Sequence, residues 1–360
     1  MLNGHEMISQ LYFWAGTITI SAKLGADVTG KSYLVTGGTG FIGAALVKGL
    51  VKEGHRVRTL DNNSRGAHRR LSDIAGEYEH VEGDVRDYAT FLEAARGVDS
   101  VCHLAFVNGT EFFYSMPEVV LDVGVKGMIN AIDVCKSLKI SELVVASSSE
   151  VYQTPPTVPT DEKVRLMIPD VFNPRYSYAA GKILSEVMAI NYGRKFFERV
   201  IIFRPHNIYG PDMGWEHVVP QFAMRMNELC KKYPGKEKVE FPMQGDGHET
   251  RAFAFIDDAI RALTLLLKKG KHLEIYNIGT DHEVTIGEVA RMVGKQFGRD
   301  VIVVPGEAAA GGTPRRCPDI TKMRALGYEP QTSLETGIQA TVSWYNANSN
   351  LAPVKSAAVQ

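Results

Sequence analysis

The chain has 360 residues, of which 44% are hydrophobic and 22% are charged, and its formal net charge is -1. A chain of this length and composition buries a sizeable core and fills one large domain or two smaller ones. The balanced charge, without long single-sign runs, argues against nucleic acid or an anionic membrane as a partner, so we expect a globular protein that acts on small molecules.

Cysteine usage and the N-terminal segment bear on where the protein works. The four cysteines lie far apart without C-x-x-C spacing, so neither a disulfide framework nor a zinc site is indicated. The apolar stretch Ile8–Ala22 is too short to span a bilayer and lacks the positive leader of a signal peptide. We expect a cytoplasmic protein without a metal, in which residues 1–30 form an extension whose role the sequence does not indicate.

From Lys31 onward, short β-branched runs alternate with longer amphipathic stretches, as is typical of a parallel sheet with helices on both faces. Each run is hydrophobic enough to predict a strand buried on both faces. The predicted strands are Tyr33–Thr36, Arg56–Asp61, Glu79–Glu82, Ser100–Leu104, Glu142–Ser147 and Val200–Arg204. The predicted helices between them are Ile42–Glu53, Ala89–Arg96, Pro117–Leu138 and Tyr178–Lys195. The predicted fold class is therefore α/β, with a doubly wound parallel sheet.

After Pro205 the pattern loosens into loop-rich sequence, which predicts a smaller mixed α/β lobe. We divide the chain into a sheet domain (31–205), a mainly substrate-binding lobe (206–348) and a C-terminal tail (349–360). Ligands of open parallel sheets bind beyond the carboxyl ends of the strands, so we expect the site in the cleft between the two parts. The elements expected in the lobe are helices near Val219–Lys232, Asp257–Lys268 and Thr285–Phe297, and a strand at Ile275–Ile278.

A glycine-rich turn joins the first predicted strand to the first predicted helix. In TGGTGFIG, Gly37 permits the tight turn, Gly40 lets the backbone approach a pyrophosphate, and Gly43 allows close helix packing. The helix N-terminus adds N–H groups and the positive end of the helix dipole. Asp61 ends the second strand, where it can accept hydrogen bonds from an adenosine ribose and repel a 2′-phosphate. The pattern predicts NAD rather than NADP.

Other residues near this turn extend the cofactor prediction. Arg58 and Arg65 lie close to Asp61 in the sequence and keep NADP open as an alternative. Asp84 follows the third strand, where it suits either the adenine end of the cofactor or a turn or helix cap. The predicted cofactor-binding set is Gly37, Gly40, Phe41, Ile42, Gly43, Asp61, Asn62, Asp84, Val85 and Leu104, with Tyr178 and Lys182.

A serine cluster and a Tyr-x-x-x-Lys pair provide candidate catalytic groups. The fifth predicted strand ends in ASSSEVYQ, and Tyr178 and Lys182 lie four residues apart on the next helix, so they share one face. Tyrosine has a pKa of about 10, and Lys182 with an oxidised nicotinamide ring is placed to lower it. Ser148 can share the hydrogen bond of a substrate hydroxyl with Tyr178. The pair alone is a common amphipathic pattern, but its place after the glycine-rich turn and the serines predicts catalysis.

The motifs TGGTGFIG, CHLAF, ASSSEVYQ, YSYAAGK and RPHNIYGP occur in this order. Together they resemble the extended short-chain dehydrogenase/reductase superfamily, which contains the nucleotide-sugar epimerases, dehydratases and decarboxylases. The resemblance covers nearly everything from Lys31 to Trp344. It implies a Rossmann-like sheet and a tightly held NAD. It further implies that Ser148, Tyr178 and Lys182 form a catalytic trio for hydride removal from C4 of a nucleotide-linked sugar.

The same resemblance extends to the second lobe and to assembly. It implies that Asn207, Arg251 and Arg316 contact the nucleotide diphosphate or the sugar. Arginine suits a diphosphate because its planar guanidinium bonds two oxygens at once, although a surface or structural ion pair is the alternative for both arginines. The resemblance also implies a homodimer that forms through the long helices Pro117–Leu138 and Tyr178–Lys195.

Four positions depart from the family pattern. Gly124 stands where Asn is usual, Phe106 where Ala is usual, Gln153 where Gly is usual, and Ala252 where Asp is usual. None of these departures removes a reacting group. They bear on the shape of the substrate pocket more than on catalysis.

Glu150 bears on which reaction follows oxidation at C4. Ser149 and Glu150 resemble the same positions of UDP-glucuronate decarboxylases and GDP-mannose 4,6-dehydratases, where the glutamate works near C5 and C6. A 4-ketone acidifies the C5 hydrogen and eases loss of a C6 carboxylate, so one oxidation can lead to epimerisation, dehydration or decarboxylation. The alternative for Glu150 is a carboxylate that anchors its loop or pairs with an arginine.

The sequence therefore predicts this shared chemistry and no single product. One alternative is a net NAD-dependent oxidoreductase of a nucleotide sugar or a small hydroxyl compound. Another is a non-enzymatic NAD-binding regulator, against which the intact Ser148, Tyr178 and Lys182 count.

Overall fold

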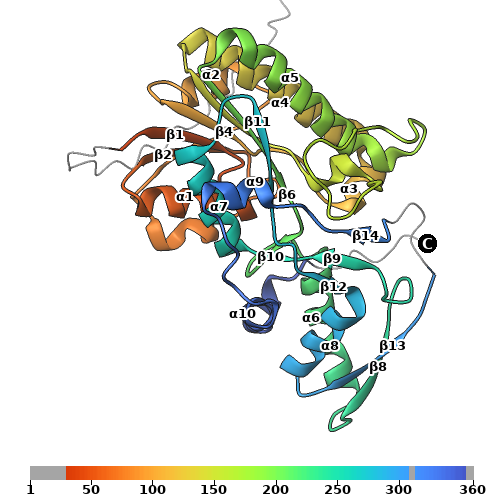
Figure 1. The fold of residues 1–360 in the computed structure, drawn as a ribbon. Coiled ribbons are helices and arrows are strands. Elements are labelled where there is room, and N and C mark those ends of the chain that lie inside the picture. The colour runs from red at the N-terminus through yellow and green to blue at the C-terminus, as the bar shows by residue number, and fades with distance from the viewer. Residues whose placement is uncertain (1–29, 308–312, 354–360) are drawn as a thin grey trace, which may run out of the picture.

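The computed structural model describes residues 30–307 and 313–353. The apolar stretch Ile8–Ala22 lies outside these residues, and so does most of the predicted C-terminal tail. The described chain forms a seven-stranded parallel sheet with helices on both faces and a smaller lobe at one side (Figure 1). The predicted α/β fold class is confirmed.

The sheet has the strand order β11-β6-β5-β4-β1-β2-β3, and every neighbouring pair is parallel. The order reverses between β1 and β4, so the carboxyl ends of these two strands border a crevice. The six strands predicted before Pro205 are present within one residue of their predicted bounds. The strands are β1 (Ser32–Thr36), β2 (Arg56–Asp61), β3 (Glu79–Glu82), β4 (Ser100–His103), β5 (Glu142–Ala146), β6 (Arg199–Pro205) and β11 (Glu274–Ile278).

The edge strand β3 contradicts the prediction that every strand is buried on both faces. None of its four residues is buried, and within the described sheet β3 pairs with β2 alone. An edge strand has no neighbour on one side, and charged side chains protect such an edge from pairing with another chain. The two glutamates of the sequence EHVE fit this edge position.

Two groups of helices cover the two faces of the sheet (Figure 1). One face packs against α1 (Phe41–Lys52), α7 (Ile256–Lys269) and α9 (Thr321–Leu326). The other packs against α2 (Tyr88–Ala94), α4 (Pro117–Leu138) and α5 (Ser177–Phe196), and the two long helices α4 and α5 lie side by side. None of the described helices combines the length and hydropathy that crossing a membrane requires.

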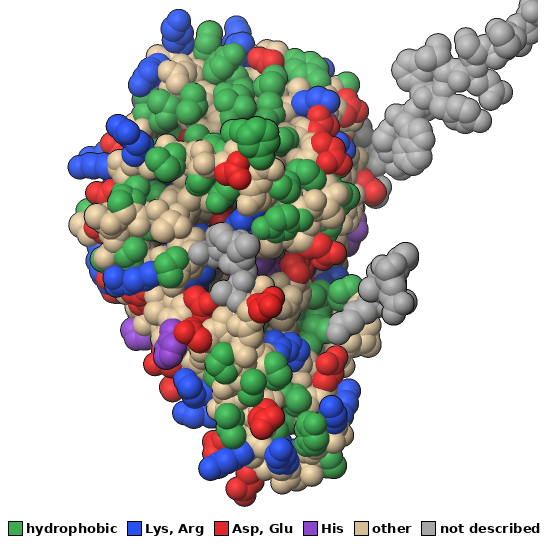
Figure 2. All heavy atoms as spheres, turned by 90° about the vertical axis from the view of Figure 1, so that its right-hand side faces the viewer, with side chains coloured by type: hydrophobic (Ala, Val, Ile, Leu, Met, Phe, Trp, Pro, Cys, Tyr) green, Lys and Arg blue, Asp and Glu red, His purple; other side chains and the backbone are tan. Residues whose placement is uncertain are grey.

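The lobe has its own core, built around Phe222, Met226, Phe241 and Val293. In a view from the side, the lobe narrows away from the sheet, and hydrophobic side chains are scattered among charged ones on both parts (Figure 2). Its helices are α6 (Val218–Lys232), α8 (Ile286–Gln296) and α10 (Leu334–Ala347). Its strands form the pair β8 (Lys238–Pro242) and β13 (Asp300–Val304), and the sheet β12 (Glu283–Thr285), β9 (Thr250–Ala252) and β14 (Arg315–Arg316).

The chain returns from the lobe to the sheet domain. The sequence predicts the strand Ile275–Ile278 in the lobe. In the structure this strand, β11, pairs with β6 in the main sheet instead. Helix α7 packs against α1 on one face of that sheet. A short pair, β7 (Ile208–Tyr209) with β10 (Ala254–Phe255), lies along this path. We propose the division near residue 205 for the two main parts, with α7, α9 and β11 belonging to the sheet domain.

Candidate active site

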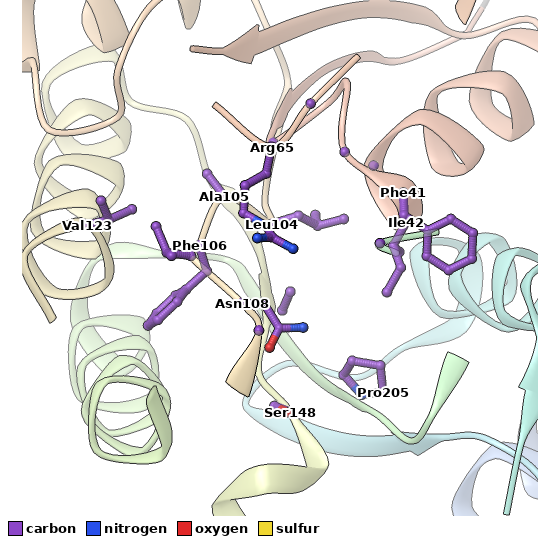
Figure 3. A pocket seen from close by; sticks show the side chains of 18 of the residues that line it. Phe41, Ile42, Arg65, Leu104, Ala105, Phe106, Asn108, Val123, Ser148 and Pro205 are labelled. Atoms are coloured by element: carbon purple, nitrogen blue, oxygen red, sulfur yellow. The ribbon is translucent and has the colours of Figure 1, made fainter. Parts of the chain in front are cut away.

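A cavity of about 400 Å³ lies at the carboxyl ends of the central strands, where the sheet domain meets the lobe. Residues that follow β1, β2, β3, β4, β5 and β6 all contribute to its wall. Figure 3 shows Phe41 and Ile42 on one side, Phe106 on the other, and Arg65 and Asn108 between them. The cavity lies where the sequence predicted the cleft site.

The glycine-rich turn at one end of the cavity leaves room for glycine alone at two positions. Gly37 has a φ of 69°, and a Cβ there would lie 2.9 Å from the Ala105 amide nitrogen. A Cβ at Gly43 would lie 2.0 Å from the Gly37 carbonyl oxygen. Among the described residues no side chain caps the start of α1, and its first turn holds no acidic residue. This helix end beside the cavity suits a pyrophosphate.

Asp61 and Asp84 lie along the cavity at the ends of β2 and β3. The Asp61 carboxylate accepts hydrogen bonds from the amides of Thr39 at 3.0 Å and Asn63 at 2.9 Å. Asn62 donates to Asp84 at 3.0 Å and so links the two strand ends. Asp84 also accepts from the amide two residues later, the turn contact that was its alternative role. The predicted residues Phe41, Ile42, Val85 and Leu104 line the same wall.

Arg58 and Arg65, which kept NADP open, both have carboxylate partners. Arg58 donates to Glu79 at 2.6 Å, and Arg58 is not among the residues that line the cavity in the described chain. Arg65 lines the cavity, but it pairs with Glu216 of the lobe and lies 4.5 Å from the Phe112 ring centroid. Both guanidinium groups are therefore engaged, and Asp61 faces the expected ribose position, which supports NAD.

Ser148, Tyr178 and Lys182 come together at another part of the cavity wall. Ser148 follows β5, and the other two residues lie on the first turns of α5. All three side chains are buried. The Lys182 Nζ donates to the Ala146 carbonyl oxygen at 2.7 Å and lies 5.7 Å from the Tyr178 ring centroid. The structure thus brings the predicted trio into one place.

Burial governs the protonation of the Tyr178 and Lys182 pair. Burial raises the pKa of Tyr178 above its usual value, and the hydrogen bond with Ser148 opposes this rise. Burial lowers the pKa of Lys182 to about 7, and the charge of Glu186 opposes this fall. The pKa of Tyr178 is therefore raised, whereas a base that works near neutral pH requires a lowered pKa. The predicted role of Tyr178 therefore calls for nearby positive charge, which an oxidised nicotinamide ring would supply.

Glu150 lines the cavity and is paired with Arg316. Burial acts to raise the pKa of Glu150, but Arg316 and then Arg175 and Arg251 lower it below its usual value. The arginine pairing that was the alternative for Glu150 is therefore present, and Glu150 is a carboxylate anion. Three guanidinium groups surround this one negative charge.

The three predicted substrate residues occupy different positions. Asn207 lines the cavity and donates to the Ala252 carbonyl oxygen at 3.3 Å. Arg316 is buried, and its Nε has no hydrogen-bond partner among the described residues. Arg251 donates to the Thr250 carbonyl oxygen at 2.7 Å, and burial lowers its pKa to about 10. Neither arginine belongs to the described cavity wall, but both act on the charge of Glu150, which does.

Several wall residues were not expected from the sequence. Phe113 stacks on Tyr178 with 4.8 Å between ring centroids, although helical spacing gave no sign of this contact. Met213, Gly214 and His217 reach the cavity from a lobe loop without a recognisable motif. Within the described residues, donor atoms that lie close enough together to hold a metal ion occur in His68, His80 and Glu82, outside the cavity wall.

The chain is similar to a family model, to curated relatives and to solved structures. The NAD dependent epimerase/dehydratase family matches residues 33–279. A dTDP-4-dehydro-6-deoxy-D-allose reductase from Streptomyces bikiniensis is 32% identical over 330 residues, which cover 88% of this chain and 96% of the relative. A UDP-N-acetyl-alpha-D-glucosaminuronate decarboxylase from Bacillus cytotoxicus is 29% identical over 335 residues, which cover 89% of this chain and 99% of the relative.

A solved structure of similar fold contains the cofactor that the sequence predicted. It is a double mutant of DesIV, a dTDP-glucose 4,6-dehydratase from Streptomyces venezuelae, with NAD bound. The TM-score is 0.78 at 29% sequence identity, and the match covers 88% of this chain and 98% of that chain. The predicted resemblance is confirmed.

Proposed function

The chain belongs to the NAD dependent epimerase/dehydratase family, and on that premise we propose that it oxidises the C4 hydroxyl of a nucleotide-linked sugar, epimerises, dehydrates or decarboxylates the 4-keto sugar and returns the hydride. One observation carries the proposal. Ser148, Tyr178 and Lys182 line the same cavity as the glycine-rich turn and Asp61. The candidate proton acceptor and the candidate dinucleotide site thus line one cavity.

The cavity wall fits NAD along its length. The start of α1, with Gly37, Gly40 and Gly43, would hold the pyrophosphate, and Asp61 with Asn62 would hold the adenosine ribose. When bound, NAD supplies the hydride acceptor and later the hydride donor. The remaining wall residues proposed to contact it are Phe41, Ile42, Asp84, Val85 and Leu104, with Tyr178 and Lys182.

The chain's own catalytic groups handle the proton. Tyr178 takes the proton of the C4 hydroxyl, and Ser148 donates a hydrogen bond to the oxygen on which negative charge develops. Lys182, held by the Ala146 carbonyl, adds positive charge near the phenolate and has further N–H groups for a ribose hydroxyl. In the outcomes in which the C4 ketone is reduced, Tyr178 returns the proton to the C4 oxygen, with Ser148 and Lys182 in the same places.

The arginine cluster favours an anionic substrate. Arg175, Arg251 and Arg316 act together on the carboxylate of Glu150, and Glu249 also acts on Arg251. Guanidinium groups bind two oxygens of a phosphate or carboxylate at once. We propose that Arg251 and Arg316, with Asn207, hold the nucleotide diphosphate or a sugar carboxylate. Glu150 is an anion, so it can remove a proton near C5 but cannot donate one.

A specific observation favours a second function in the same site. The Streptomyces bikiniensis relative is named as a reductase, so its reaction changes the net oxidation state of the sugar. By likeness to it, the second candidate is a net oxidoreductase of a nucleotide sugar. The two functions differ in whether NAD is regenerated within each turnover.

A panel of nucleotide sugars tests the proposal. The protein is incubated with UDP-, GDP-, CDP- and dTDP-sugars, and product mass and cofactor oxidation state are both measured. Unchanged mass identifies an epimerase, loss of water a dehydratase, and loss of carbon dioxide a decarboxylase. Cofactor turned over in proportion to product identifies the net oxidoreductase, and no change in any sugar refutes the first function.

We also propose that two copies of the chain associate through α4 and α5. Apolar side chains on both helices remain exposed in the single chain, among them Val187 at 51% and Phe196 at 50%. Burial of such side chains in a dimer removes apolar surface from water. Sedimentation of the purified protein tests this, because a monomer at micromolar concentration contradicts it. The other exposed apolar residues of this face are Leu121, Ile129, Leu184 and Tyr192.

A further inference from the structure

Phe106, one of the departures from the family pattern, contacts both candidate catalytic side chains of α5. The Lys182 Nζ lies 3.9 Å from the Phe106 ring centroid. The rings of Phe106 and Tyr178 meet edge to face, with 5.0 Å between centroids and 80° between planes. Phe113 stacks on Tyr178 as well. Two aromatic rings therefore pack on the phenol, and one of them also faces the ammonium group.

Two glycines on facing helices make the space for the Phe106 ring. A Cβ at Gly124 of α4 would lie 2.2 Å from the Phe106 Cζ, and a Cβ at Gly181 of α5 would lie 3.0 Å from the same atom. Figure 3 shows Phe106 turned away from Ile42 and toward these helices. Any larger side chain at Gly124 would push the ring out of this slot. The phenylalanine at position 106 therefore requires the glycine at position 124, so the two departures from the family pattern belong together.

Among residues 30–307 and 313–353, few charged or polar groups face the Lys182 ammonium. From β5, the Ala146 carbonyl accepts its hydrogen bond, and from α5, Tyr178 and Glu186 lie near it. From β4, His103 lies nearby, and burial together with the charge of Lys182 lowers the pKa of His103 to about 3. A buried ammonium group with so few partners is costly, and the face of an aromatic ring stabilises a cation best where water is excluded.

We propose that Phe106 is a positioning residue whose ring holds the Lys182 ammonium and the Tyr178 phenol in their places on the cavity wall and keeps water from both. The inference rests on the proposed function, in which these two side chains carry the proton. Phe106 acts through Lys182 and Tyr178. It has no group that exchanges protons, so its influence is on the protonation and geometry of its two neighbours.

The titration of Lys182 tests this inference without any substrate. The full-length protein is exposed to trace acetic anhydride at pH values from about 5 to 11, and acetylation of Lys182 is followed by peptide mass spectrometry. Wild-type Lys182 should titrate near its lowered pKa of about 7. Phe106→Leu keeps apolar bulk but removes the aromatic face, so the midpoint should fall by about one pH unit or more. Phe106→Ala admits water, so the midpoint should rise toward the ordinary value of 10.5.

Two further variants complete the test. Gly124→Ala leaves the Phe106 ring intact but displaces it, so the Lys182 midpoint should rise here too. Phe222→Leu removes a buried ring from the lobe, where its edge-to-face partner is Phe241, and should leave the midpoint unchanged. Circular dichroism identifies any variant that does not fold, and Phe106→Leu keeps the test open if Phe106→Ala fails to fold.

Each outcome has a clear meaning. Opposite shifts in Phe106→Leu and Phe106→Ala support the proposal, and unchanged midpoints or shifts of the same sign overturn it. If wild-type Lys182 takes up no reagent, labelling must appear in Phe106→Ala, since continued protection would show that Phe106 is not the shield. Inactivity toward every nucleotide sugar would refute the proposed function, and the labelling result would still decide the role of Phe106.

Discussion

At the residue scale, the proposed chemistry depends on two buried groups whose pKa values are shifted by their surroundings. Lys182 lies among an aromatic ring, a carbonyl and a carboxylate, and Tyr178 lies among rings with one hydroxyl beside it. A dry environment penalises whichever form is charged. The pair therefore becomes competent through positive charge brought into the cavity, which agrees with a cofactor that carries its charge at the nicotinamide ring.

Tyr178→Phe should fold, bind NAD and lose most of its turnover. The variant keeps the ring stacked on Phe113 but lacks the hydroxyl that takes the substrate proton, and loss of a general base lowers rates by about 10²- to 10⁴-fold. Steady-state kinetics on the substrate found in the panel measure the loss. Tyr176→Phe is the matched control and should retain its rate. Near-normal turnover of Tyr178→Phe would move the proton acceptor to another residue.

Lys182 should make protein stability depend on pH in a defined window. Its folded pKa of about 7 lies below its ordinary value of 10.5, so between these values the unfolded chain binds a proton that the folded chain does not. Stability contributed by this site therefore rises with pH from about 7, by at most about 1.4 kcal/mol per pH unit. Denaturant unfolding of wild type and Lys182→Met at pH 7 to 9 measures it. As the pH increases, the free energy of unfolding of wild type should rise relative to that of Lys182→Met. A difference that stays constant with pH would contradict the lowered pKa of Lys182.

Glu150→Gln should separate oxidation from the step that follows it. If Glu150 removes a proton near C5, the glutamine variant still oxidises C4 but stalls afterwards, with turnover reduced by about 10²-fold or more. Reduced cofactor should accumulate on the enzyme and be visible by its absorbance after substrate is added. Circular dichroism must show a folded protein, because the variant also loses the ion pair with Arg316. A simple 4-epimerase would turn over almost normally with no trapped reduced cofactor.

At the element scale, a buried polar network supports the segment that carries Ser148 and Glu150. Arg204 of β6 donates to Glu186 of α5 at 2.6 Å, and both side chains are almost fully buried. Arg204 also donates to the Tyr152 hydroxyl at 2.7 Å, and that hydroxyl donates to Asn277 of β11. The network ties the sheet, α5 and the short helix after Ser148 into one unit. The hydrogen bonds of this network join residues that lie far apart in the chain.

Glu186→Ala should destabilise the fold strongly. Removal of one partner leaves the Arg204 charge buried without its carboxylate, which costs about 3–5 kcal/mol. The free energy of unfolding in denaturant measures this change. Glu93→Ala is the matched control, since its ion pair with Arg96 is exposed on both sides and should contribute less than about 1 kcal/mol. Equal effects of the two substitutions would show that the network does not stabilise the protein.

The elements differ in how well the sequence predicted them. The strands β1, β2 and β5 and the helix α4 contain hydrophobic runs or helical spacing within the segment itself, so local pattern was sufficient. The lobe strands β9 and β14 have three and two residues, too few to show a period, and they form because distant segments pair. Helix α10 was not predicted. Its sequence contains glycine, threonine and valine, which favour helices weakly, and the helix packs on the lobe core through Ile338, Val342 and Tyr345.

The candidate site also combines features that local motifs predict with features that only long-range packing creates. The glycine-rich turn, the Ser148 segment and the Tyr178 helix are local motifs, and the structure brings their residues to one cavity as expected. The pair of Arg65 with Glu216 joins positions 151 residues apart, and no local signal marks it. The place of Phe106 over Gly124 needed the packing of α4 against α5, although the two departures were visible in the sequence. Long-range packing is the information that the sequence pattern lacked.

At the scale of the whole molecule, the cavity is lined by segments from both parts of the chain. Arg65 after β2 pairs with Glu216 of the lobe, and Arg69 pairs with Asp212 of the same lobe loop. These ion pairs hold the lobe loop beside the cofactor wall. A cofactor held between two parts of the chain is expected to stay bound while the sugar is oxidised and hydride is returned, whereas the net oxidoreductase alternative requires the cofactor to leave after each turnover.

The fate of a deuterium label at C4 tests this central claim most directly. Enzyme with one equivalent of NAD is given an excess of C4-deuterated substrate from the panel, and product mass and free cofactor are measured. We expect many turnovers per NAD, product that retains the deuterium and no reduced cofactor released to solution. Product that lacks the label, with reduced cofactor released in equal amount, would contradict the account and establish net oxidation instead.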